Sequence, residues 1–584
     1  MIVLGLNSVF HESAAALVVD GRVVAAAEEE RFTRRKHAKP AAVDNAHVLP
    51  GEAIRFCLAE AGVRAADIDR VSYSYDPDLR REKFLIDTMS TPGDWGSREG
   101  EDAFNESLRK VPGAVREALG EDVPITYVQH HLAHAASVYY TDCPEDAAVL
   151  VADGIGESAA TVLLSGSGGQ LKLLDQIEYP HSIGFLWEKL SKFLGFSEYD
   201  ACKVMGLAGY GDASVYARAF SEFVHVGTRR YAMDLDVLRF RLPDTGPLER
   251  LLGSPRHAGE PIEQRHADIA AALQDTTNKI MLGLVRHIHD LHPVRDLGLA
   301  GGVALNCTTN YLIKEQGPFE NIHIPSAPHD AGTAIGGALE VAPPRRGKPK
   351  ARRSVYSGPG FSDEQISRAL DTTSWLTETP GDLYGVVADL LCSGAVVGWF
   401  QGRMEWGPRA LGNRSLLADP RDPAMREILN HKIKHREHFR PFAPSVLAEY
   451  ADEWFDLGRP SQAHEAMLFA TPIRPGFAER IPAVSHADGT ARVQIVRADV
   501  NARLHRLITR FYERTGVPMV LNTSFNDSEP IVCTPADALR TFAATRIDAL
   551  VMGDRLVRRV GRVAEALPVT TAELNRAVPA LART

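Results

Sequence analysis

The sequence lacks the features that mark secreted, zinc-ribbon and membrane proteins. Its six cysteines are scattered along 584 residues without a Cys-x-x-Cys pair, which is typical of a reducing compartment and argues against a structural zinc site. No basic segment precedes an apolar run at the N-terminus, and no apolar stretch is long enough to span a bilayer. We therefore expect a cytoplasmic protein with no signal peptide and no membrane partner.

The sequence also has fewer basic than acidic residues. The chain has 65 Lys and Arg against 75 Asp and Glu, a net charge of -10. Nucleic-acid binding normally needs a broad basic face, so this balance argues against a nucleic-acid partner and against a tRNA-modifying role. Hydrophobic residues make up 45% and charged residues 24%, as in ordinary globular proteins, and the length predicts two domains or three.

A pair of histidines points to a metal site. Residues 128–137 are rich in alanine and predict the start of a helix. His130 and His134 are four residues apart and share one helix face, so both imidazoles can bind one ion. His131 and His134 form a competing pair, and the alternative is that all three are ordinary core or surface histidines.

Two aspartates strengthen the metal hypothesis. Asp153 ends a predicted buried strand at residues 147–152, and Asp330 precedes a predicted helix of small residues. Two imidazoles and two carboxylates together suit a borderline divalent ion. For Asp330 the structural alternative is a helix N-cap, a role compatible with metal binding.

A strand-turn-strand pattern occurs twice. Residues 1–30 predict a strand, a polar turn that carries His11, a return strand, a tight Asp20-Gly21 turn and a third strand. Residues 147–164 repeat the first part of this pattern around Asp153. Such an opening is typical of the actin-like phosphotransferase fold, in which it is duplicated. The charged block at residues 28–37 that follows is either a solvated face or a substrate contact.

Further segments of this half carry weaker signals. Helices are predicted at residues 51–62 and 264–292, and residues 75–120 look polar and irregular, like an insertion or lid on the acceptor side. Lys203 lies in a stretch of small residues and is either a phosphate ligand or a surface lysine. The Gly301-Gly302 turn before Asn306 lets backbone approach a nucleotide closely.

A basic Pro/Gly linker at residues 342–353 divides the chain into a first domain, 1–341, and a second domain, 354–584. The second domain holds cations beside glycine, serine and asparagine. In an acidic protein this local excess suits a polyanion such as a triphosphate, whereas surface salt bridges would not explain the small polar residues. The candidate ligands are Arg409, Lys434, Arg440, Arg492, Asn522, Ser524 and Asn526.

These motifs resemble, in order along nearly the whole chain, those of the O-carbamoyltransferases. That family includes tobramycin, cephem and nodulation-factor carbamoyltransferases. The resemblance rests on His11, His130-x-x-x-His134, Asp153-Gly154, Lys203–Ala208, Gly301–Asn306, Asp330, Gly407–Gly412, Arg440–Ser445 and Asn522–Asn526. It implies an α/β fold, with a duplicated actin-like ATPase domain of the ASKHA, TsaD-like type followed by a YrdC-like α/β domain.

The resemblance also implies an activity. The YrdC-like domain would make carbamoyl-adenylate from carbamoyl phosphate and ATP. The actin-like domain would pass the carbamoyl group to a hydroxyl of a small natural product, as in antibiotic biosynthesis. A homodimer is compatible with this arrangement.

Residue roles follow from this resemblance together with the sequence positions described above. The family's metal is iron, so Fe²⁺ or another divalent transition metal is expected on His130, His134, Asp153 and Asp330, with Mg²⁺ accompanying ATP. His11 and Lys203 are expected to be catalytic. The nucleotide and carbamoyl phosphate are expected on Gly301, Gly302, Asn306, Arg409, Lys434, Arg440, Arg492, Asn522, Ser524 and Asn526.

One departure from the family bears on the acceptor. A known member has an acidic residue shortly before the histidine of the first turn, whereas this chain has Ser8-Val9-Phe10, which disfavours a polycationic aminoglycoside. Two other functions stay open: a small-molecule kinase with the actin-like fold, which would release ADP, and a non-catalytic nucleotide-binding regulator, which would release no pyrophosphate.

Overall fold

The computed structural model describes residues 1–87, 89–345, 354–459 and 461–559. Most of the predicted linker, 346–353, and the end of the predicted second domain, 560–584, lie outside the described residues. The chain divides into two units. The first covers Met1–Arg353 together with Gly458–Ala463 and Leu468–Ala470, and the second covers the chain between and after these segments from Ser354 on.

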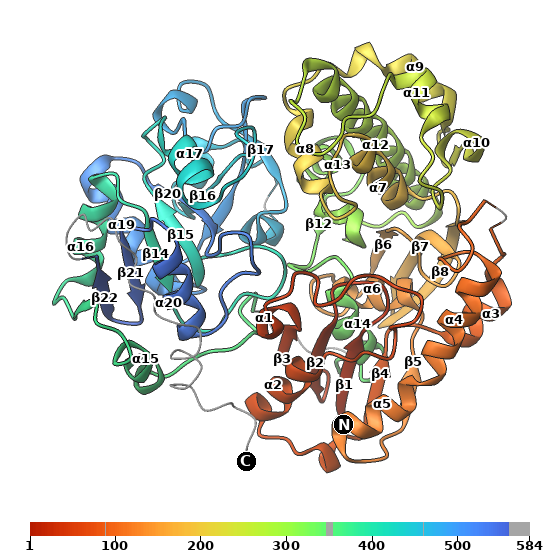
Figure 1. The fold of residues 1–584 in the computed structure, drawn as a ribbon, viewed down its shortest axis with the longest axis horizontal. Coiled ribbons are helices and arrows are strands. Elements are labelled where there is room, and N and C mark those ends of the chain that lie inside the picture. The colour runs from red at the N-terminus through yellow and green to blue at the C-terminus, as the bar shows by residue number, and fades with distance from the viewer. Residues whose placement is uncertain (88, 346–353, 460, 560–584) are drawn as a thin grey trace. The chain divides into compact units, whose positions relative to one another are not determined.

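Two five-stranded sheets of the same design form the centre of the first unit (Figure 1). The first sheet has the order β3-β2-β1-β4-β5 and contains β1 (Ile2–Asn7), β2 (Ala14–Val19), β3 (Arg22–Glu28), β4 (Arg70–Tyr73) and β5 (Ile125–Tyr127). The second has the order β8-β7-β6-β11-β12 and contains β6 (Ala147–Ala152), β7 (Ala159–Ser167), β8 (Gln170–Glu178), β11 (Asp296–Ala300) and β12 (Asn321–His323).

The two sheets share their strand directions as well as their order. In each, an antiparallel meander of three strands is extended by two parallel strands on the far side of the first strand. β6 is buried along its whole length, as a central strand covered on both faces requires. This repeated topology is the duplicated actin-like fold that the sequence predicts.

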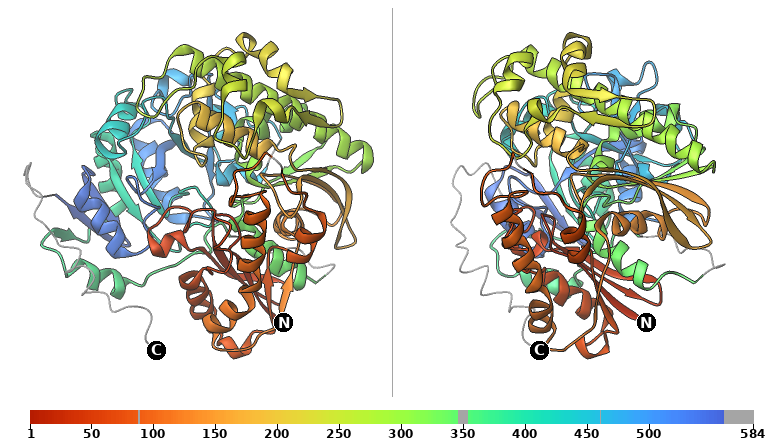
Figure 2. Two further views of the ribbon diagram at one scale, coloured as in Figure 1. Left: turned by 45° about the vertical axis from the view of Figure 1, so that its right-hand side comes forward. Right: turned by 90° about the vertical axis from the view of Figure 1, so that its right-hand side faces the viewer.

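The helices of the first unit pack on its sheets or on one another (Figure 2). They are α1 (Glu30–Thr33), α2 (Gly51–Ala61), α3 (Pro77–Lys83), α4 (Arg98–Arg109), α5 (Val111–Leu119), α6 (His130–Tyr139), α7 (Ile183–Phe193), α8 (Ala201–Ala208), α9 (Ala217–Phe223), α10 (Leu235–Leu238), α11 (Gly246–Leu252), α12 (Gln264–Leu291), α13 (Cys307–Gln316) and α14 (Ala331–Val341). A small hairpin, β9 (Val224–Val226) with β10 (Tyr231–Met233), completes the unit.

Two helices predicted from the sequence agree with the structure, and one segment predicted to be irregular does not. α2 ends at Gly62, which adopts φ 63° and caps the helix, and the predicted 264–292 helix is α12. The expectation that residues 75–120 are irregular is wrong, because α3, α4 and α5 occupy most of this segment. Phe104 and Leu108 of α4 join the core of the first sheet, so their apolar spacing outweighs the polar composition.

The second unit is built on one mixed sheet of eight strands, in the order β13-β22-β21-β14-β15-β20-β16-β19. Its strands are β13 (Leu376–Glu378), β14 (Val397–Phe400), β15 (Arg414–Ala418), β16 (Ala443–Leu447), β19 (Gln494–Val496), β20 (Met519–Ser524), β21 (Ala549–Met552) and β22 (Arg555–Arg558), with β17 (Ala470–Pro472) and β18 (Thr490–Arg492) forming a separate pair. Its helices are α15 (Asp363–Leu370), α16 (Leu383–Cys392), α17 (Met425–Glu427), α18 (Ala451–Trp454), α19 (Ala502–Thr515) and α20 (Pro535–Ala544).

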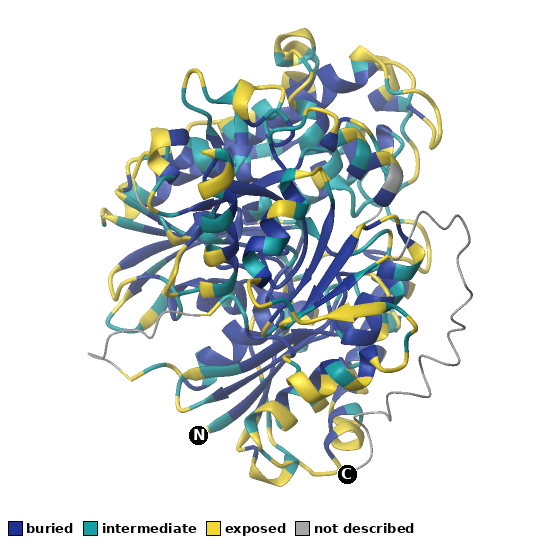
Figure 3. Ribbon diagram, turned by 90° about the vertical axis from the view of Figure 1, so that its left-hand side faces the viewer, coloured by how far each residue is buried: buried dark blue, intermediate teal, exposed yellow. Residues whose placement is uncertain are grey.

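The central strands of both units are buried along most of their length (Figure 3). β14, β15 and β16 are buried at every residue, and one apolar core surrounds them. Among the described residues, no helix is long and apolar enough to cross a membrane.

Helix α14 approaches its neighbours at backbone distance. A Cβ atom on Gly336 would lie 1.8 Å from the carbonyl oxygen of Ala133 in α6. A Cβ atom on Gly5 of β1 would lie 1.9 Å from the carbonyl oxygen of Ala334. Glycine is therefore required at both contacts, and it brings the chain around Asp330 within reach of side chains on α6.

We expect Gly336→Ala to destabilise the protein by about 2 kcal/mol or more, because overpacking a tight contact costs about 1–3 kcal/mol and the obstacle here is a main-chain carbonyl. The control is Gly113→Ala in the exposed part of α5, where no atom lies within 4 Å of the added Cβ. That change should be neutral or slightly stabilising. Chemical denaturation measures both, and equal effects would contradict the proposed contact.

Candidate metal centre and cationic sheet edge

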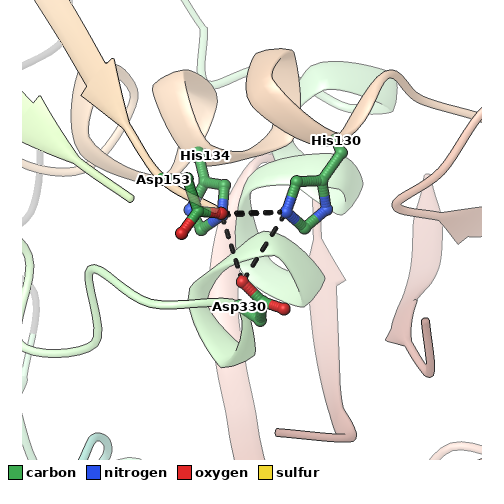
Figure 4. A group of neighbouring side chains, drawn as sticks. All are labelled: His130, His134, Asp153 and Asp330. Carbon is green, nitrogen blue, oxygen red and sulfur yellow. Dashed lines mark hydrogen bonds and ion pairs between the residues drawn. The ribbon is translucent and has the colours of Figure 1, made fainter. Parts of the chain in front are cut away.

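Four buried side chains converge in the first unit (Figure 4). His130 and His134 lie one turn apart on α6 with their Nε2 atoms 3.2 Å from each other. Asp153 follows β6, and its Oδ2 lies 3.3 Å from His130 Nε2 and 3.2 Å from His134 Nε2. Asp330 precedes α14, and its Oδ1 lies 3.6 Å and 3.5 Å from the same two nitrogens.

These separations fit one shared metal ion. With ligand bonds of about 2.0–2.2 Å, neighbouring ligand atoms of a tetrahedral site lie about 3.3–3.6 Å apart. The donor set of two imidazoles and two carboxylates matches a divalent transition metal. The cluster therefore has the chemistry and the spacing to hold such an ion.

Electrostatic interactions within the cluster favour charged groups although all four residues are buried. Burial acts to raise the pKa of Asp153, but hydrogen bonds from His130 and His134 outweigh it and hold that pKa well below its usual range. Burial acts to lower the pKa of His130, but the two aspartates raise it well above its usual range. A cation at the centre would therefore compete with protons for these ligand atoms.

Hydrogen bonds from outside the cluster orient the side chains of His130 and Asp153 and hold the main chain at Asp330. His130 Nδ1 faces the Ser74 carbonyl oxygen at 3.4 Å, which leaves Nε2 directed at the cluster. The Gly302 N–H donates to Asp153 Oδ1 at 3.0 Å, so the other carboxylate oxygen faces the histidines. The Thr333 hydroxyl lies 2.9 Å from the Ser74 hydroxyl and 2.6 Å from the Asp330 carbonyl oxygen.

The structure distinguishes the two histidine pairs that the sequence left open. His131 is buried but does not belong to the four-residue cluster. Burial, with the nearby charge of His130, lowers the pKa of His131 to about 3, so its ring is neutral. A Cβ atom on Gly156 would lie 2.5 Å from His131 Nδ1, which shows how closely the turn after Asp153 covers this ring.

The N-cap alternative for Asp330 is wrong. In the described chain its side chain accepts no capping hydrogen bond from α14 and faces the two histidines. Glu157 is the carboxylate that accepts a hydrogen bond at the start of a helix here. It accepts from the N–H of His130, the first residue of α6, at 2.9 Å and from the Asp76 N–H at 2.8 Å. Sequence reasoning missed Glu157, although its place at the end of the Asp153 turn was a usable signal.

The turn that carries His11 is tightly held. Phe10 has φ 58° and Glu12 has φ 56°. The residues on both sides of His11 therefore adopt the left-handed backbone conformation, although neither is a glycine. The Asn7 side chain donates to the carbonyl oxygens of His11 and Glu12 at 3.2 and 3.1 Å. Phe10 packs edge-on against the ring of His130, with centroids 5.9 Å apart, which links this turn to the four-residue cluster.

The charged block at residues 28–37 is not a solvated face at its start, because Glu28, Glu29, Glu30 and Arg31 are buried. Arg31 forms ion pairs with Glu28 at 2.6 Å and with Glu30 at 2.7 Å. Glu29 accepts from the first N–H groups of α2, and burial raises its pKa to about 7.

The other predicted residues of the first unit have local partners. Lys203 forms an ion pair with Asp200 at 3.2 Å. Gly301 adopts φ 87°, and a Cβ atom there would lie 2.2 Å from the Ala152 carbonyl oxygen. Asn306 caps α13 and exchanges side-chain hydrogen bonds with Gln274 at 3.0 and 3.2 Å. Their catalytic and nucleotide-binding roles stay predictions.

In the second unit the predicted phosphate ligands share one edge of the sheet. The register pairs Ser415 with Ser524, Ala443 with Asn522 and Ser445 with Gln494. The starts of β15, β16 and β19 therefore meet the end of β20 at one edge. The residues placed there are Arg409 before β15, Arg440 before β16, Arg492 before β19, and Ser524 at the end of β20.

Lys434 joins this edge directly. Its Nζ donates to the Asn526 side-chain oxygen at 2.6 Å, to the Asn526 carbonyl oxygen at 2.7 Å and to the Ser524 hydroxyl at 3.3 Å. Burial, reinforced by Arg436 and Arg440, lowers the pKa of Lys434 well below its usual range. An incoming anion would relieve that penalty.

The side chain of Asn522 is hydrogen-bonded to neighbouring strands of the sheet. Its amide nitrogen donates to the Ser445 hydroxyl and to the Gln494 side chain, both at 2.9 Å. Two residues that sequence reasoning missed shape the nearby loop. Glu405 Oε1 accepts from the N–H groups of Leu411 and Asn413 at 2.7 Å, and the buried Arg414 guanidinium binds carbonyl oxygens of the same loop.

Comparison with protein families identifies the chain. Residues 2–339 match the family model described as carbamoyltransferase N-terminus, and residues 388–559 match the carbamoyltransferase C-terminus. Nodulation protein NolNO of Sinorhizobium fredii is 38% identical, over 95% of this chain and 80% of that protein. An uncharacterized protein of Synechocystis is 38% identical, over 94% of this chain and 95% of that protein. The chain belongs to the carbamoyltransferase family and is a carbamoyltransferase enzyme.

Solved structures give a weaker likeness. ROK hexokinase from Thermus thermophilus is matched over 58% of this chain and 98% of that chain, at 16% identity and a TM-score of 0.28. Full-length HypF, in a phosphate- and nucleotide-bound form, is matched over 58% of this chain and 55% of that chain, at 14% identity and a TM-score of 0.31. Such scores add nothing to the assignment of the fold, which rests on the repeated strand order.

We expect His130→Ala and Asp330→Ala to abolish stoichiometric metal binding. Loss of an outer hydrogen-bond partner alone weakens a metal site about 10- to 100-fold, so loss of a direct ligand should weaken it by at least ~100-fold. Elemental analysis and equilibrium titration with Fe²⁺, Co²⁺ and Zn²⁺ measure this.

The matched control is His131→Asn, which changes the neighbouring buried histidine outside the cluster. This variant should retain its metal. Full metal occupancy in both ligand variants, or equal loss in all three, would contradict the assignment.

Proposed function

We propose that the protein is an ATP-dependent O-carbamoyltransferase. It makes carbamoyl-adenylate from carbamoyl phosphate and ATP in the YrdC-like second unit, and it transfers the carbamoyl group to a hydroxyl of a small natural product in the actin-like first unit. The observation that carries this proposal is the buried cluster of His130, His134, Asp153 and Asp330 at the strand and helix ends of an actin-like unit. Family membership supports the carbamoyl chemistry.

The first half-reaction consumes two anions. Cleavage of carbamoyl phosphate by water gives carbamate and phosphate, and a carbamate oxygen then attacks the α-phosphorus of Mg²⁺-bound ATP while pyrophosphate leaves. The cationic edge made by Arg409, Lys434, Arg440 and Arg492 suits these substrates, because guanidinium groups bind phosphate oxygens in a fixed, charge-assisted geometry.

The second half-reaction joins the carbamoyl carbon to the acceptor oxygen. That C–O bond forms, the bond from the carbamoyl carbon to the AMP oxygen breaks, and the acceptor proton passes to His11. A bound divalent ion such as Fe²⁺ would act as a Lewis acid on the carbamoyl-adenylate. Gly301, Gly302 and Asn306 are proposed to lie against the nucleotide, and Lys203 to approach its phosphate.

The acceptor is proposed to be an uncharged polyol or sugar. The first turn has Ser8-Val9-Phe10 before His11, and Phe10 is packed among Tyr75, Trp95 and Phe104. This stretch offers a cationic acceptor no carboxylate. A panel of glycerol, glucose and kanamycin tests the class, and transfer to kanamycin alone would contradict it.

The decisive test of the proposed chemistry is its product pattern. Incubation with carbamoyl phosphate, ATP and Mg²⁺ should yield carbamoyl-adenylate, phosphate and pyrophosphate, and AMP once the carbamoyl group is transferred. Release of ADP would indicate a kinase instead. Nucleotide binding without pyrophosphate would indicate a regulator.

Arg440→Ala should slow the formation of carbamoyl-adenylate by roughly 10- to 100-fold, since a hydrogen bond to a charged group is worth about 1.5–3 kcal/mol. The control is Arg497→Ala. Arg497 follows β19 at the opposite edge of the sheet and forms an exposed ion pair with Asp499. Pyrophosphate release measures both variants, and a normal rate for Arg440→Ala would exclude this arginine from the substrate site.

His11→Asn should leave the formation of carbamoyl-adenylate unchanged while transfer to the acceptor falls by ~10²–10⁴, the usual contribution of a general base. Both half-reactions are measured on the same folded preparation by following pyrophosphate and the carbamoylated product. If His11 only supports the hairpin, thermal stability will fall while transfer per folded molecule stays unchanged.

A further inference from the structure

A second histidine and a carboxylate lie directly behind His11. Glu12 Oε1 is 2.5 Å from His37 Nδ1 and 4.0 Å from His11 Nδ1. The His37 ring stacks on Tyr199 with centroids 4.4 Å apart, and the His11 ring meets the same tyrosine edge-on at 5.5 Å. Two imidazoles thus flank one carboxylate and share one aromatic neighbour.

Several contacts fix this arrangement. The His37 N–H donates to Glu30 Oε2 at 2.7 Å, and Glu30 pairs with the buried Arg31. His37 has φ 61° and Glu12 has φ 56°, conformations that side-chain-bearing residues adopt only when surrounding contacts hold them. Strained non-glycine residues of this kind cluster at active sites and ligand-binding sites.

The charge state of the pair is equally well defined. Burial acts to raise the pKa of Glu12, but the hydrogen bond from His37, with the charges of His329, His37 and His11, lowers it to about 2. Burial acts to lower the pKa of His37, but Glu12 and Glu30 raise it. Glu12 is therefore a carboxylate anion at neutral pH.

His11 itself has an unmatched polar atom on this side. Its Nδ1 is buried and has no hydrogen-bond partner among the described residues, and the side-chain oxygen it faces is Glu12 Oε1. A separation of 4.0 Å is longer than a hydrogen bond, but catalytic hydrogen bonds often tighten only when substrate is bound. A proton on Nδ1 would point at the carboxylate and leave the Nε2 lone pair free.

We propose that Glu12, held by His37, is a positioning residue that keeps His11 in the Nδ1-protonated tautomer, with Nε2 presented to the acceptor hydroxyl. This rests on the proposed function in one respect, that His11 is the base for carbamoyl transfer. The acceptor proton moves to Nε2, the C–O bond to the acceptor forms, AMP leaves, and Glu12 stabilises the resulting imidazolium. The logic is that of a nucleophile, a base and a carboxylate that orients the base.

The tautomer can be observed without turnover. In protein labelled with ¹⁵N-histidine, long-range ¹H–¹⁵N spectra report which ring nitrogen carries the proton, and His11→Gln assigns the signal. Wild-type His11 should be protonated on Nδ1, and Glu12→Ala should remove that preference. An Nε2-protonated His11 in the wild type, or an unchanged signal in Glu12→Ala, would overturn the proposal.

A pair of variants separates positioning by His37 from bulk packing. His37→Asn keeps an N–H donor near the place of Nδ1, whereas His37→Ala removes it. The Nδ1-protonated signal should persist in His37→Asn and weaken in His37→Ala, with both thermal midpoints measured. Loss in both variants, or in neither, would remove His37 from the proposal.

Kinetics supply the link to catalysis. Glu12→Gln retains an oxygen acceptor for His37 but removes the charge, so kcat for transfer to an acceptor from the panel should fall by ~10²–10⁴ with little change in KM. Pyrophosphate release should stay at the wild-type rate. If the protein makes no carbamoyl-adenylate at all, the proposed function fails, while the tautomer of His11 still decides this inference.

Discussion

The contact on which the first unit depends is the approach of α14 to α6 through Gly336. Because this residue has no side chain, the helix lies against the carbonyl oxygen of Ala133. Larger side chains at this contact would push the two helices toward the wide end of the usual range of about 8–10 Å and move Asp330 away from the histidines. The close approach brings ionisable groups from three distant parts of the chain into one buried volume, where low dielectric strengthens every interaction among them.

Much of the fold could be predicted because its signals are local. The Asp20-Gly21 turn, the glycine that ends α2 and the buried run before Asp153 each specify their own structure. The His130 and His134 pair was visible for the same reason, since four residues make one helical turn. The duplication was visible because the strand-turn-strand pattern is repeated along the sequence.

What could not be predicted depends on contacts between distant segments. Nothing near Glu29 in the sequence says that it caps α2, and nothing near Glu157 says that it meets the first N–H of α6. The buried state of the 28–31 block follows from pairing within the fold, which composition does not reveal. Likewise the helices of residues 77–119 were obscured by their polar surface, since only a narrow apolar stripe faces the core.

Because the sheet is duplicated, the two turns that carry candidate site residues lie in separate copies of one topology. One turn follows the first strand of each copy: the first carries His11, and the second carries Asp153. They belong to separate hairpins with separate hydrogen-bond partners, and the contact that joins the first turn to the four-residue cluster is that of Phe10 with His130. Substitutions in the first turn that keep the contact of Phe10 with His130 would therefore leave the four-residue cluster intact, so the turn has room to vary within that one limit.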